Sequence, residues 1–424
     1  MMGTQARRFV VLCPHFAPDI APTGKVMTQI VGEWAALGHE IHVITALPWY
    51  REHRVEASWR GRLVRRERTE WGSITRIHPF PAKSKTNLAV RAFAFIAFSV
   101  IAGICAVMVR RSIGTRRVTH RGIDAVIAMS PPLTLGTIGW LVARLRRAQL
   151  IFNVQDVFPD AVVKTGAVSN KTIIALASWL ERFTYQRSNA VVVLSADLQG
   201  NVRGKIGADK TGRVHVIENF VDTAGITPQD RMTPYRRELG INDEVVVMYA
   251  GNVGFSQSLD TLVEVARHMP QVIILINGAG AALQSLRQRA AGITNVRFGD
   301  YQPEARLSEV LATGDIHVVP LRAGLASVSV PSKTYAVLAA GRCVVAAVDR
   351  DTEIERLITR AGAGVCVAPD DIEALRAALS ALVDDQTRRA TFGHAGRVYI
   401  QQHPTARDVA AAYVRLLPDS LSNS

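Results

Sequence analysis

The sequence predicts an α/β protein with two parallel, doubly wound sheets. Short apolar runs rich in β-branched residues alternate with segments of helical periodicity along most of the chain, as in strands joined by crossover helices. The alternation pauses at residues 218–237, where polar and turn-forming residues are frequent, and then starts again. The chain has 424 residues, 48% of them hydrophobic, so it is long enough for two domains of ordinary size.

Strands and helices alternate in the first half, which we expect to form one domain over residues 1–217. The first helix has a clear end, because Gly38 follows its last apolar position and glycine commonly terminates helices. The predicted strands are 9–13, 41–45, 74–80, 124–129, 150–154 and 190–194, and the predicted helices are 25–37, 133–147 and 171–187.

The second half repeats the pattern, and we expect a second domain over residues 238–403 with residues 218–237 as the linker. A further helix lies within "VPSKTYAVLAAGRCVVA", residues 330–346, and ends at Gly341 before a run of β-branched residues. The predicted strands are 245–249, 271–276, 296–298 and 316–319, and the predicted helices before residue 330 are 259–268, 281–290 and 305–313.

The net charge of +14 is concentrated in residues 51–121, which hold sixteen lysines and arginines against four glutamates. Such a segment suits nucleic acid, an anionic membrane or an acidic substrate, or it forms a solvated face. It adjoins residues 92–109, which carry no charge. A membrane span there would put strands of one sheet on opposite sides of the bilayer. We therefore expect either a helix in the core or a helix that lies on an anionic membrane surface through residues 88–121, and we favour the second. No nucleic-acid-binding signature accompanies the charge, which argues against nucleic acid.

The cysteines and the N-terminus limit the other classes. Four cysteines lie far apart without a CxxC pair, which argues against a disulfide framework or a zinc site. The first apolar run is too short for a signal peptide and leads straight into the first predicted strand. We therefore expect a cytoplasmic protein that associates peripherally with the inner face of the cell membrane.

Three glycine-containing loops follow predicted strands, where doubly wound sheets bind phosphates. "PTGK", residues 22–25, lacks the first glycine and the hydroxyl residue of a P-loop, yet its amides can still approach a diphosphate. "NGAGAAL", residues 277–283, has Leu283 at the third glycine position of a dinucleotide fingerprint, which argues against a nicotinamide site. "AGNVGFSQSL", residues 250–259, predicts either a tight turn or close approach of the backbone to phosphate.

The stretch "PSK" sets a lysine in the first turn of a helix. Ser332 is the expected N-cap, and Lys333 then opposes the helix dipole, a penalty that a bound anion would reverse. The alternative is a lysine that points into water, because one exposed charge costs at most about 1 kcal/mol.

Residues 320–375, which include "PSKTYAVLAAG", resemble the donor-binding half of the retaining glycosyltransferases of family 4, in the bacterial branch that builds colanic acid, O-antigen and related polysaccharides. The first half is similar to the same branch, through "PHFAPDIAPTGK" and "VQDVFPDAVV" among others. The resemblance implies a GT-B fold with two Rossmann-like domains, an interdomain cleft that holds a nucleotide-diphosphate-sugar, and a C-terminal helix in residues 404–424 that crosses back to the first domain.

The resemblance also implies site residues. Asp156 stands where many members carry a histidine that touches the transferred sugar, and Glu353 matches the acid of a Pro-Glu-Ile-like turn; alternatively Thr352 caps a helix whose dipole Glu353 complements. Asp156 and Lys333 are the candidate catalytic residues. The expected donor-binding residues are Gly24, Lys25, Gly251, Asn252, Gly254, Arg322, Ser332, Lys333 and Glu353.

The sequence also departs from the family pattern. A Glu-x7-Glu motif in the wider family falls on Val328 and Ala336 here, and the donor-loop Arg and Lys are replaced by residues 255–257, so Lys333, Arg322 and Lys25 are the expected substitutes. "DRD", residues 349–351, resembles a metal motif of a different transferase fold. The expected reaction is transfer of a sugar, with retention and without a required metal or cofactor, to a lipid-linked or cell-envelope glycan. The alternative is a noncatalytic nucleotide- or glycan-binding subunit.

Overall fold

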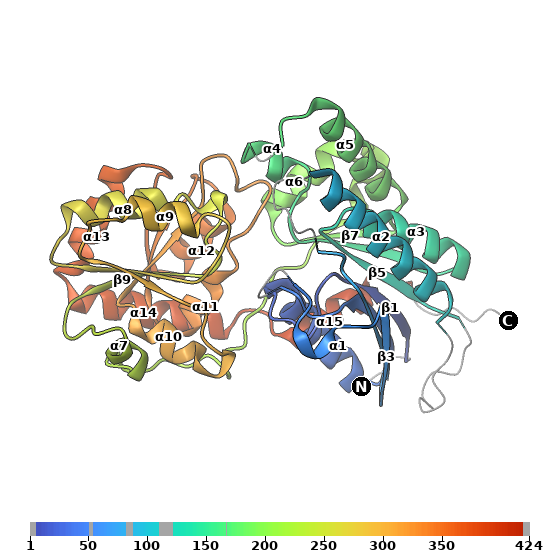
Figure 1. The fold of residues 1–424 in the computed structure, drawn as a ribbon, viewed down its shortest axis with the longest axis horizontal. Coiled ribbons are helices and arrows are strands. Elements are labelled where there is room, and N and C mark those ends of the chain that lie inside the picture. The colour runs from blue at the N-terminus through green and yellow to red at the C-terminus, as the bar shows by residue number, and fades with distance from the viewer. Residues whose placement is uncertain (1–5, 51–53, 82–87, 110–121, 167, 419–424) are drawn as a thin grey trace. The chain divides into compact units, whose positions relative to one another are not determined.

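The computed structural model describes residues 6–50, 54–81, 88–109, 122–166 and 168–418. The chain divides into two compact units (Figure 1). The first unit comprises residues 1–219 and 404–424, and the second comprises residues 220–403. Each unit has one open sheet with helices on both faces, which confirms the predicted pair of Rossmann-like α/β folds.

The sheet of the first unit has eight strands in the order β3-β4-β2-β1-β5-β6-β7-β8. Its central strand β1 is buried at every position, which explains its uninterrupted apolar run after Arg8. The strands are β1 (Arg8–Leu12), β2 (Glu40–Ala46), β3 (Val64–Thr69), β4 (Gly72–Ile77), β5 (Ala125–Ser130), β6 (Gln149–Val154), β7 (Ala190–Val193) and β8 (Val214–Val216). The helices are α1 (Pro22–Ala36), α2 (Leu88–Val107), α3 (Thr134–Arg146), α4 (Asp160–Lys164), α5 (Lys171–Arg187), α6 (Ala196–Lys205) and α15 (Ala406–Arg415).

The prediction of an entirely parallel first sheet is wrong at one edge. β3 pairs antiparallel with β4, whereas the other neighbouring strands of this sheet run parallel. β3 reads "VRRERT", and its charged side chains are largely exposed because it is an edge strand with one open side. This composition concealed the strand in the sequence.

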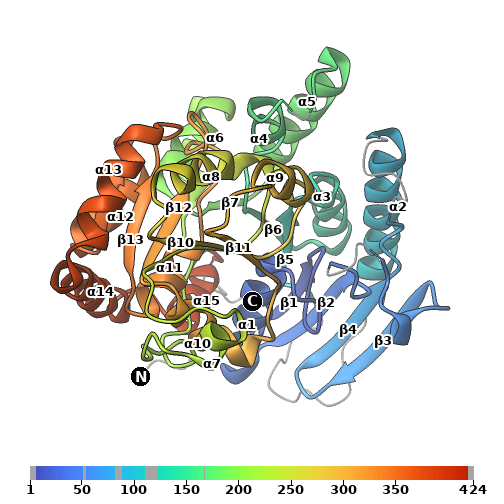
Figure 2. The same cartoon turned by 60° about the vertical axis from the view of Figure 1, so that its left-hand side comes forward.

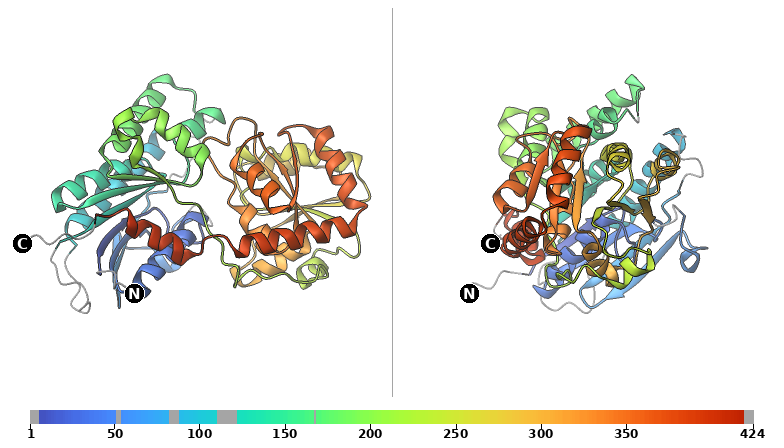
Figure 3. Two further views of the ribbon diagram at one scale, coloured as in Figure 1. Left: turned by 180° about the vertical axis from the view of Figure 1, so that it is seen from behind. Right: turned by 90° about the vertical axis from the view of Figure 1, so that its left-hand side faces the viewer.

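The C-terminal helix α15 completes the core of the first unit (Figure 3), and it packs against α1. The indole Nε1 of Trp34 donates a hydrogen bond to the carbonyl oxygen of Ala410 at 2.9 Å. The amide Nδ2 of Asn153 donates to the Tyr413 hydroxyl at 2.5 Å, and both side chains are buried. Residues 404–418 therefore belong to the first unit although more than 180 residues of the second unit precede them.

The second unit has a six-stranded parallel sheet in the order β11-β10-β9-β12-β13-β14. Its strands are β9 (Val246–Ala250), β10 (Ile273–Asn277), β11 (Val296–Gly299), β12 (Ile316–Pro320), β13 (Cys343–Ala347) and β14 (Gly364–Val367). Its helices are α7 (Pro234–Glu238), α8 (Leu259–His268), α9 (Leu283–Arg289), α10 (Leu307–Thr313), α11 (Lys333–Ala339), α12 (Glu353–Ala361), α13 (Ile372–Val383) and α14 (Gln386–Gln401).

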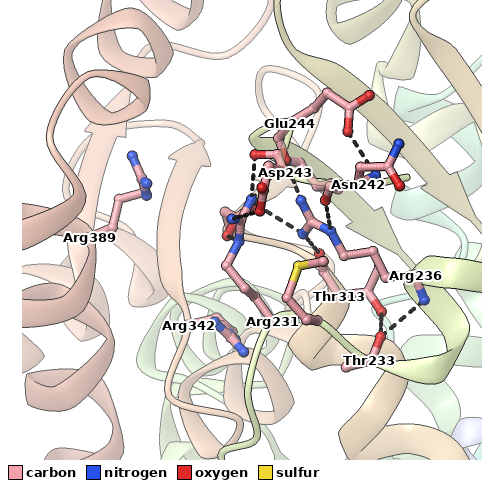
Figure 4. A network of polar contacts seen from close by, with 12 residues as sticks. Arg231, Thr233, Arg236, Asn242, Asp243, Glu244, Thr313, Arg342 and Arg389 are labelled. Atoms are coloured by element: carbon pink, nitrogen blue, oxygen red, sulfur yellow. Dashed lines mark hydrogen bonds and ion pairs between the residues drawn. The ribbon is translucent and has the colours of Figure 1, made fainter. Parts of the chain in front are cut away.

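The predicted linker is bound to the second unit from residue 220 onward and contains α7. Arg231 and Arg236 come from this segment (Figure 4). Both form ion pairs with Asp315, which lies directly before β12. Asp315 Oδ2 also accepts the backbone N–H of Val246 at 2.8 Å, at the start of β9. Two of the arginines in this polar segment are therefore members of an ionic network with Asp315.

Helix α2 has one covered face and one exposed apolar face. Ser99 and Thr134 share a hydrogen bond of 2.7 Å between their hydroxyls, which joins α2 to α3. On the opposite side Phe93, Ile96 and Ile104 are 69%, 51% and 55% exposed. No helix of the described residues is long and apolar enough to cross a membrane. Arg110, Arg111, Arg116 and Arg117, which the membrane hypothesis also uses, lie outside the described residues.

Candidate active site

The second sheet changes direction between β9 and β12. From β9 the chain proceeds through β10 to β11 on one side, and from β12 through β13 to β14 on the other. The loops that leave β9 and β12 therefore diverge, and in open parallel sheets this position leaves a ligand crevice beyond the carboxyl ends of the strands. Gly251 and Asn252 directly follow β9, and Arg322 follows β12.

Two glycine loops lie side by side at the carboxyl ends of the strands. Gly251 and Gly278 both have positive φ angles, of 144° and 145°, which side-chain-bearing residues rarely adopt. The backbone N–H of Gly251 donates to the carbonyl oxygen of Asn277 at 2.9 Å, and that of Val253 donates to Ala279 at the same distance. A Cβ on Gly278 would stand 1.9 Å from the carbonyl oxygen of Gly251. Glycine is thus required for the two loops to approach so closely.

Lys333 extends from the first residue of α11 toward the loop after β9. Its ammonium Nζ donates to the Tyr249 hydroxyl at 2.5 Å and lies 3.9 Å from the centroid of that ring. The Tyr249 hydroxyl in turn donates to the carbonyl oxygen of Asn252 at 2.5 Å. A Cβ on Gly251 would lie 3.4 Å from Nζ, so the positive charge is next to the glycine loop.

The electrostatic state of Lys333 is unusual. Burial lowers the pKa of its ammonium to about 7, and among the described residues no carboxylate forms an ion pair with it. The face of the Tyr249 ring attracts the cation and offsets part of the cost of desolvation. Burial also raises the pKa of Tyr249, which keeps its hydroxyl protonated. The arrangement presents a positive charge without a counter-charge, as an anion-binding site requires.

The structure corrects the predicted role of Ser332. This residue occupies the N-cap position of α11, but its side chain caps no backbone N–H, and its backbone is already helical. The turn is closed instead by Thr334, whose hydroxyl donates to the carbonyl oxygen of Pro331 at 2.9 Å. The alternative of a lysine that points into water is also excluded, because Nζ contacts Tyr249.

The other donor-binding candidates of the second unit lie in loops at the same carboxyl ends of the strands. The backbone N–H of Arg322 donates to the carbonyl oxygen of Ser256 at 2.8 Å, which joins the loops after β12 and β9. The backbone N–H of Gly254 donates to Gln257 Oε1 at 3.0 Å, so Gly254 shapes the loop. Glu353 is the first residue of α12 and forms an ion pair with Arg356 at 3.3 Å.

The neighbouring polar residues are occupied by structural contacts. Thr352 does not cap α12 through its side chain, because its hydroxyl donates to the carbonyl oxygen of Asp349 at 2.7 Å. Asp349 Oδ2 accepts the backbone N–H of Gly324 at 2.7 Å. Within the described residues no group of three or more His, Cys, Asp or Glu side chains can hold a metal ion, so residues 349–351 form no such cluster.

Gly24, Lys25 and Asp156 belong to the first unit. Gly24 is buried near the start of α1, where a Cβ would stand 2.8 Å from the Cβ of His15. Lys25 lies on the next position of α1, and Asp156 lies two residues beyond the end of β6, half-buried. Their predicted contacts with a donor or a sugar stay predictions.

Sequence reasoning missed two polar features. Tyr249 is the last-but-one residue of a buried strand and reads as a core position, so nothing in the sequence indicates its contact with Lys333. In the first unit, His15 Nδ1 and Asp19 Oδ2 lie 2.7 Å apart in the loop after β1. The spacing of four residues between a histidine and an aspartate, directly after a strand, was the available signal for this pair.

Comparisons with known proteins agree with this geometry. Residues 23–219 match the family model of the glycosyl transferase 4-like domain, and residues 244–385 match that of the glycosyl transferases group 1. The chain is 27% identical over 380 residues to the putative colanic acid biosynthesis glycosyl transferase WcaI of Escherichia coli, covering 86% of this chain and 89% of WcaI. It is 25% identical over 293 residues to the probable glycosyltransferase WbjE of Pseudomonas aeruginosa, covering 67% and 71% of the two chains.

Solved structures share the fold at low identity. Sucrose-phosphate synthase from Thermosynechococcus elongatus superimposes with a TM-score of 0.74 at 16% identity, covering 97% of this chain and 98% of the synthase. Anabaena HepE in complex with UDP-glucose gives a TM-score of 0.70 at 12% identity, with 96% and 98% covered. The two family matches, one in each unit, and the alignment along 86% of the chain show that the protein belongs to the GT-B glycosyltransferases of the family 4 type, in the colanic acid and O-antigen branch.

Proposed function

We propose that this glycosyltransferase moves a hexose from a nucleotide-diphosphate-sugar to a lipid-linked or cell-envelope glycan, with retention of configuration at the anomeric carbon. The environment of Lys333 is the main support for a donor that contains a diphosphate. Its desolvated ammonium has no carboxylate partner among the described residues and lies beside the glycine loop after β9. A diphosphate supplies the missing negative charge, and the backbone N–H groups of a glycine loop are good donors to phosphate oxygens.

The names of similar proteins support the same substrates. Anabaena HepE was solved with UDP, with UDP and glucose, and with UDP-glucose, which supports a nucleotide-diphosphate-sugar as donor. WcaI is named for colanic acid biosynthesis, and WaaG for lipopolysaccharide biosynthesis, which supports a cell-envelope acceptor.

Retention is proposed from the residues that surround the donor loop. A double displacement needs a carboxylate nucleophile. The two positions that carry acids in the wider family are Val328, which is fully buried, and Ala336, so neither supplies a carboxylate. The carboxylate of Glu353 forms an ion pair with Arg356. We therefore propose front-face transfer, in which the departing diphosphate takes the proton of the acceptor hydroxyl. Lys333 stabilises the negative charge that develops on the leaving group.

The test combines binding with product analysis. Calorimetric titration with UDP, GDP, dTDP and NAD should show binding of one nucleoside diphosphate to the wild-type protein and its loss in Lys333→Ala. The matching nucleotide-sugar should then give a product whose anomeric signals in NMR show retained configuration. Binding of none of these nucleotides would refute the donor, an inverted product would refute retention, and donor binding without turnover would favour the noncatalytic alternative.

We propose further that residues 88–121 contact an anionic membrane surface. The exposed apolar face of α2 supports this proposal, because apolar side chains of an amphipathic helix insert between lipid headgroups. Ile96→Asp should reduce flotation with vesicles of phosphatidylglycerol and phosphatidylcholine. Val398→Asp places the same charge at an equally apolar exposed position of the second unit, and it should not affect flotation. Equal flotation of both variants and wild type would contradict membrane contact by α2.

A further inference from the structure

The first sheet has a switch point of its own, between β1 and β5. From β1 the chain proceeds to β2 on one side, and from β5 through β6 to β7 and β8 on the other. The loop after β1 therefore lies at a position where such sheets bind ligands. It contains His15 and Asp19, which no part of the donor argument uses.

The two side chains form a buried pair. His15 Nδ1 and Asp19 Oδ2 are 2.7 Å apart, and the Asp19 carboxylate is fully buried. The other carboxylate oxygen, Oδ1, accepts the backbone N–H of Tyr50 at 3.2 Å, in the loop after β2. In the neutral imidazole, a hydrogen bond from Nδ1 to this carboxylate leaves the lone pair on Nε2.

The surrounding loop is rigidly held. Arg76 Nη2 donates to the carbonyl oxygen of Ala17 at 2.6 Å, and the backbone N–H of Ala17 donates to Thr28 Oγ1 at 2.9 Å. Gly24 of α1 contacts the backbone of residues 15 and 16 so closely that no Cβ fits there. The position of the imidazole is therefore set by β4 and α1 as well as by its own loop.

The second ring nitrogen makes no hydrogen bond to the protein. Among the described residues only Asp19 bonds to the His15 ring, through Nδ1, and the side chain is 12% exposed. The imidazole is partly exposed, so Nε2 is open to solvent and to a ligand. An O–H donor from a ligand would satisfy Nε2 without any change in the Asp19 contact.

Two aromatic rings contact the His15 imidazole. Trp49 stacks on His15 with 5.6 Å between ring centroids and an angle of 23° between the ring planes. Tyr50 meets the imidazole edge-on at 5.4 Å. Aromatic faces beside a single oriented acceptor suit a ligand that has both C–H faces and hydroxyl groups, which is the character of a sugar ring.

We propose that His15 binds the acceptor: Nε2 accepts a hydrogen bond from a sugar hydroxyl of the glycan, Asp19 fixes the tautomer that permits it, and Trp49 and Tyr50 line the place of the sugar ring. The proposal rests on the proposed function, because it names the acceptor class for the same transfer. In that transfer the bond from the anomeric carbon to the acceptor oxygen forms as the bond to the diphosphate breaks, and the diphosphate leaves with the electron pair and takes the hydroxyl proton. His15 holds a hydroxyl group and takes up no proton.

The experiment distinguishes an effect on acceptor binding from an effect on donor binding. Transfer from the preferred nucleotide-sugar is measured to octyl glucoside, octyl galactoside and octyl mannoside, and UDP, GDP and dTDP affinities are measured by calorimetry. His15→Phe keeps a ring against Trp49 but has no acceptor. It should raise the KM for the octyl glycoside about tenfold, the worth of one strong hydrogen bond, and leave nucleotide affinity unchanged.

Two further variants distinguish positioning from folding. Asp19→Asn should raise the same KM, because the amide donates to Nδ1 and moves the imidazole proton to Nε2. His15→Gln places an amide oxygen near the position of Nε2 and should recover part of the lost affinity. His394→Gln, an exposed histidine of α14, should match the wild type in every measurement.

The outcomes are distinct. An unchanged KM for the glycoside in His15→Phe would overturn the role of His15. Wild-type protein that binds its nucleotide but transfers to none of the three glycosides would overturn the sugar-acceptor assignment and leave the donor site standing. Wild-type protein that binds no nucleotide would overturn the proposed function itself.

Discussion

Lys333→Met is expected to lose nucleoside diphosphate binding by a factor of about 10–150 and, at the same time, to raise the stability of the second unit. The loss follows because a charge-assisted hydrogen bond to phosphate is worth about 1.5–3 kcal/mol. The gain follows because the wild-type ammonium is desolvated beside Tyr249 with no counter-charge from the described residues. Methionine has a similar length and needs no solvation.

The gain in stability should depend on pH. The pKa of Lys333 is about 7 in the folded protein, well below the ordinary value of a lysine. Below pH 7 the ammonium is charged in both states, so the folded wild type bears the full cost of desolvation. As pH rises above 7 the folded state loses the proton that the unfolded state still holds, and wild-type stability increases. The advantage of Lys333→Met is therefore largest below pH 7 and declines toward pH 10.

Scanning calorimetry at pH 6 and pH 9.5 measures this effect. We expect about 1–3 kcal/mol at pH 6, reduced from the full pKa difference because the residue is partly exposed. Lys171→Met, at an exposed lysine of α5, serves as the control and should change stability by less than about 0.5 kcal/mol at either pH. A destabilised Lys333→Met at pH 6 would show that the ammonium already has a strong partner in the free protein.

Asp315→Ala should be the most destabilising single change in the second unit, by about 3–5 kcal/mol. Its carboxylate pairs with Arg231 at 2.7 Å and with Arg236 at 3.3 Å, and the Arg236 side chain is fully buried. Removal of the carboxylate leaves a buried guanidinium without its counter-charge, which is the costly way to break such a pair. Burial already lowers the pKa of Arg236.

Asp243→Ala is the matched control within the same network (Figure 4). Asp243 also faces Arg231, at 3.6 Å, but its side chain is 94% exposed. An exposed ion pair contributes at most about 1 kcal/mol, so this variant should unfold close to the wild type in urea. Equal effects of the two substitutions would mean that Asp315 acts as a spacer and not as a counter-charge. Asp315→Asn, which keeps the volume, tests this if the alanine variant does not fold.

The sequence predicted the fold wherever strand burial is uniform. The strands around β1 and β9 carry unbroken apolar runs, and the structure contains them within one or two residues of the predicted bounds. Prediction was incomplete where polarity has a tertiary cause. The segment with Arg231 and Arg236 was interpreted as a linker from its polar and turn residues, because the contacts of these two arginines with the distant Asp315 are not visible in the sequence. The edge strand β3 was missed for the related reason that its exposed side permits arginines.

The candidate site was predictable in its glycines and its lysine but not in its contacts. Close backbone approach requires glycine at positions 251 and 278, and this requirement is visible in the sequence. The pairing of Lys333 with Tyr249 is not visible, since 84 residues separate them. Ser332 was expected to cap α11 from local preference alone, but Thr334 forms the hydrogen bond that closes this turn.

The position of α15 affects the order in which the two units fold while the chain is being synthesised. The second unit is one continuous stretch of chain, and all of its strands have been synthesised before residue 404. The first unit is interrupted, and the Trp34 indole and the Asn153 amide Nδ2 donate hydrogen bonds to acceptors in α15. On the ribosome the order of folding is therefore reversed relative to the order of synthesis: the second unit can close first, while the first unit must wait for α15. A chain truncated at residue 403 would retain a complete second unit and an unfinished first one.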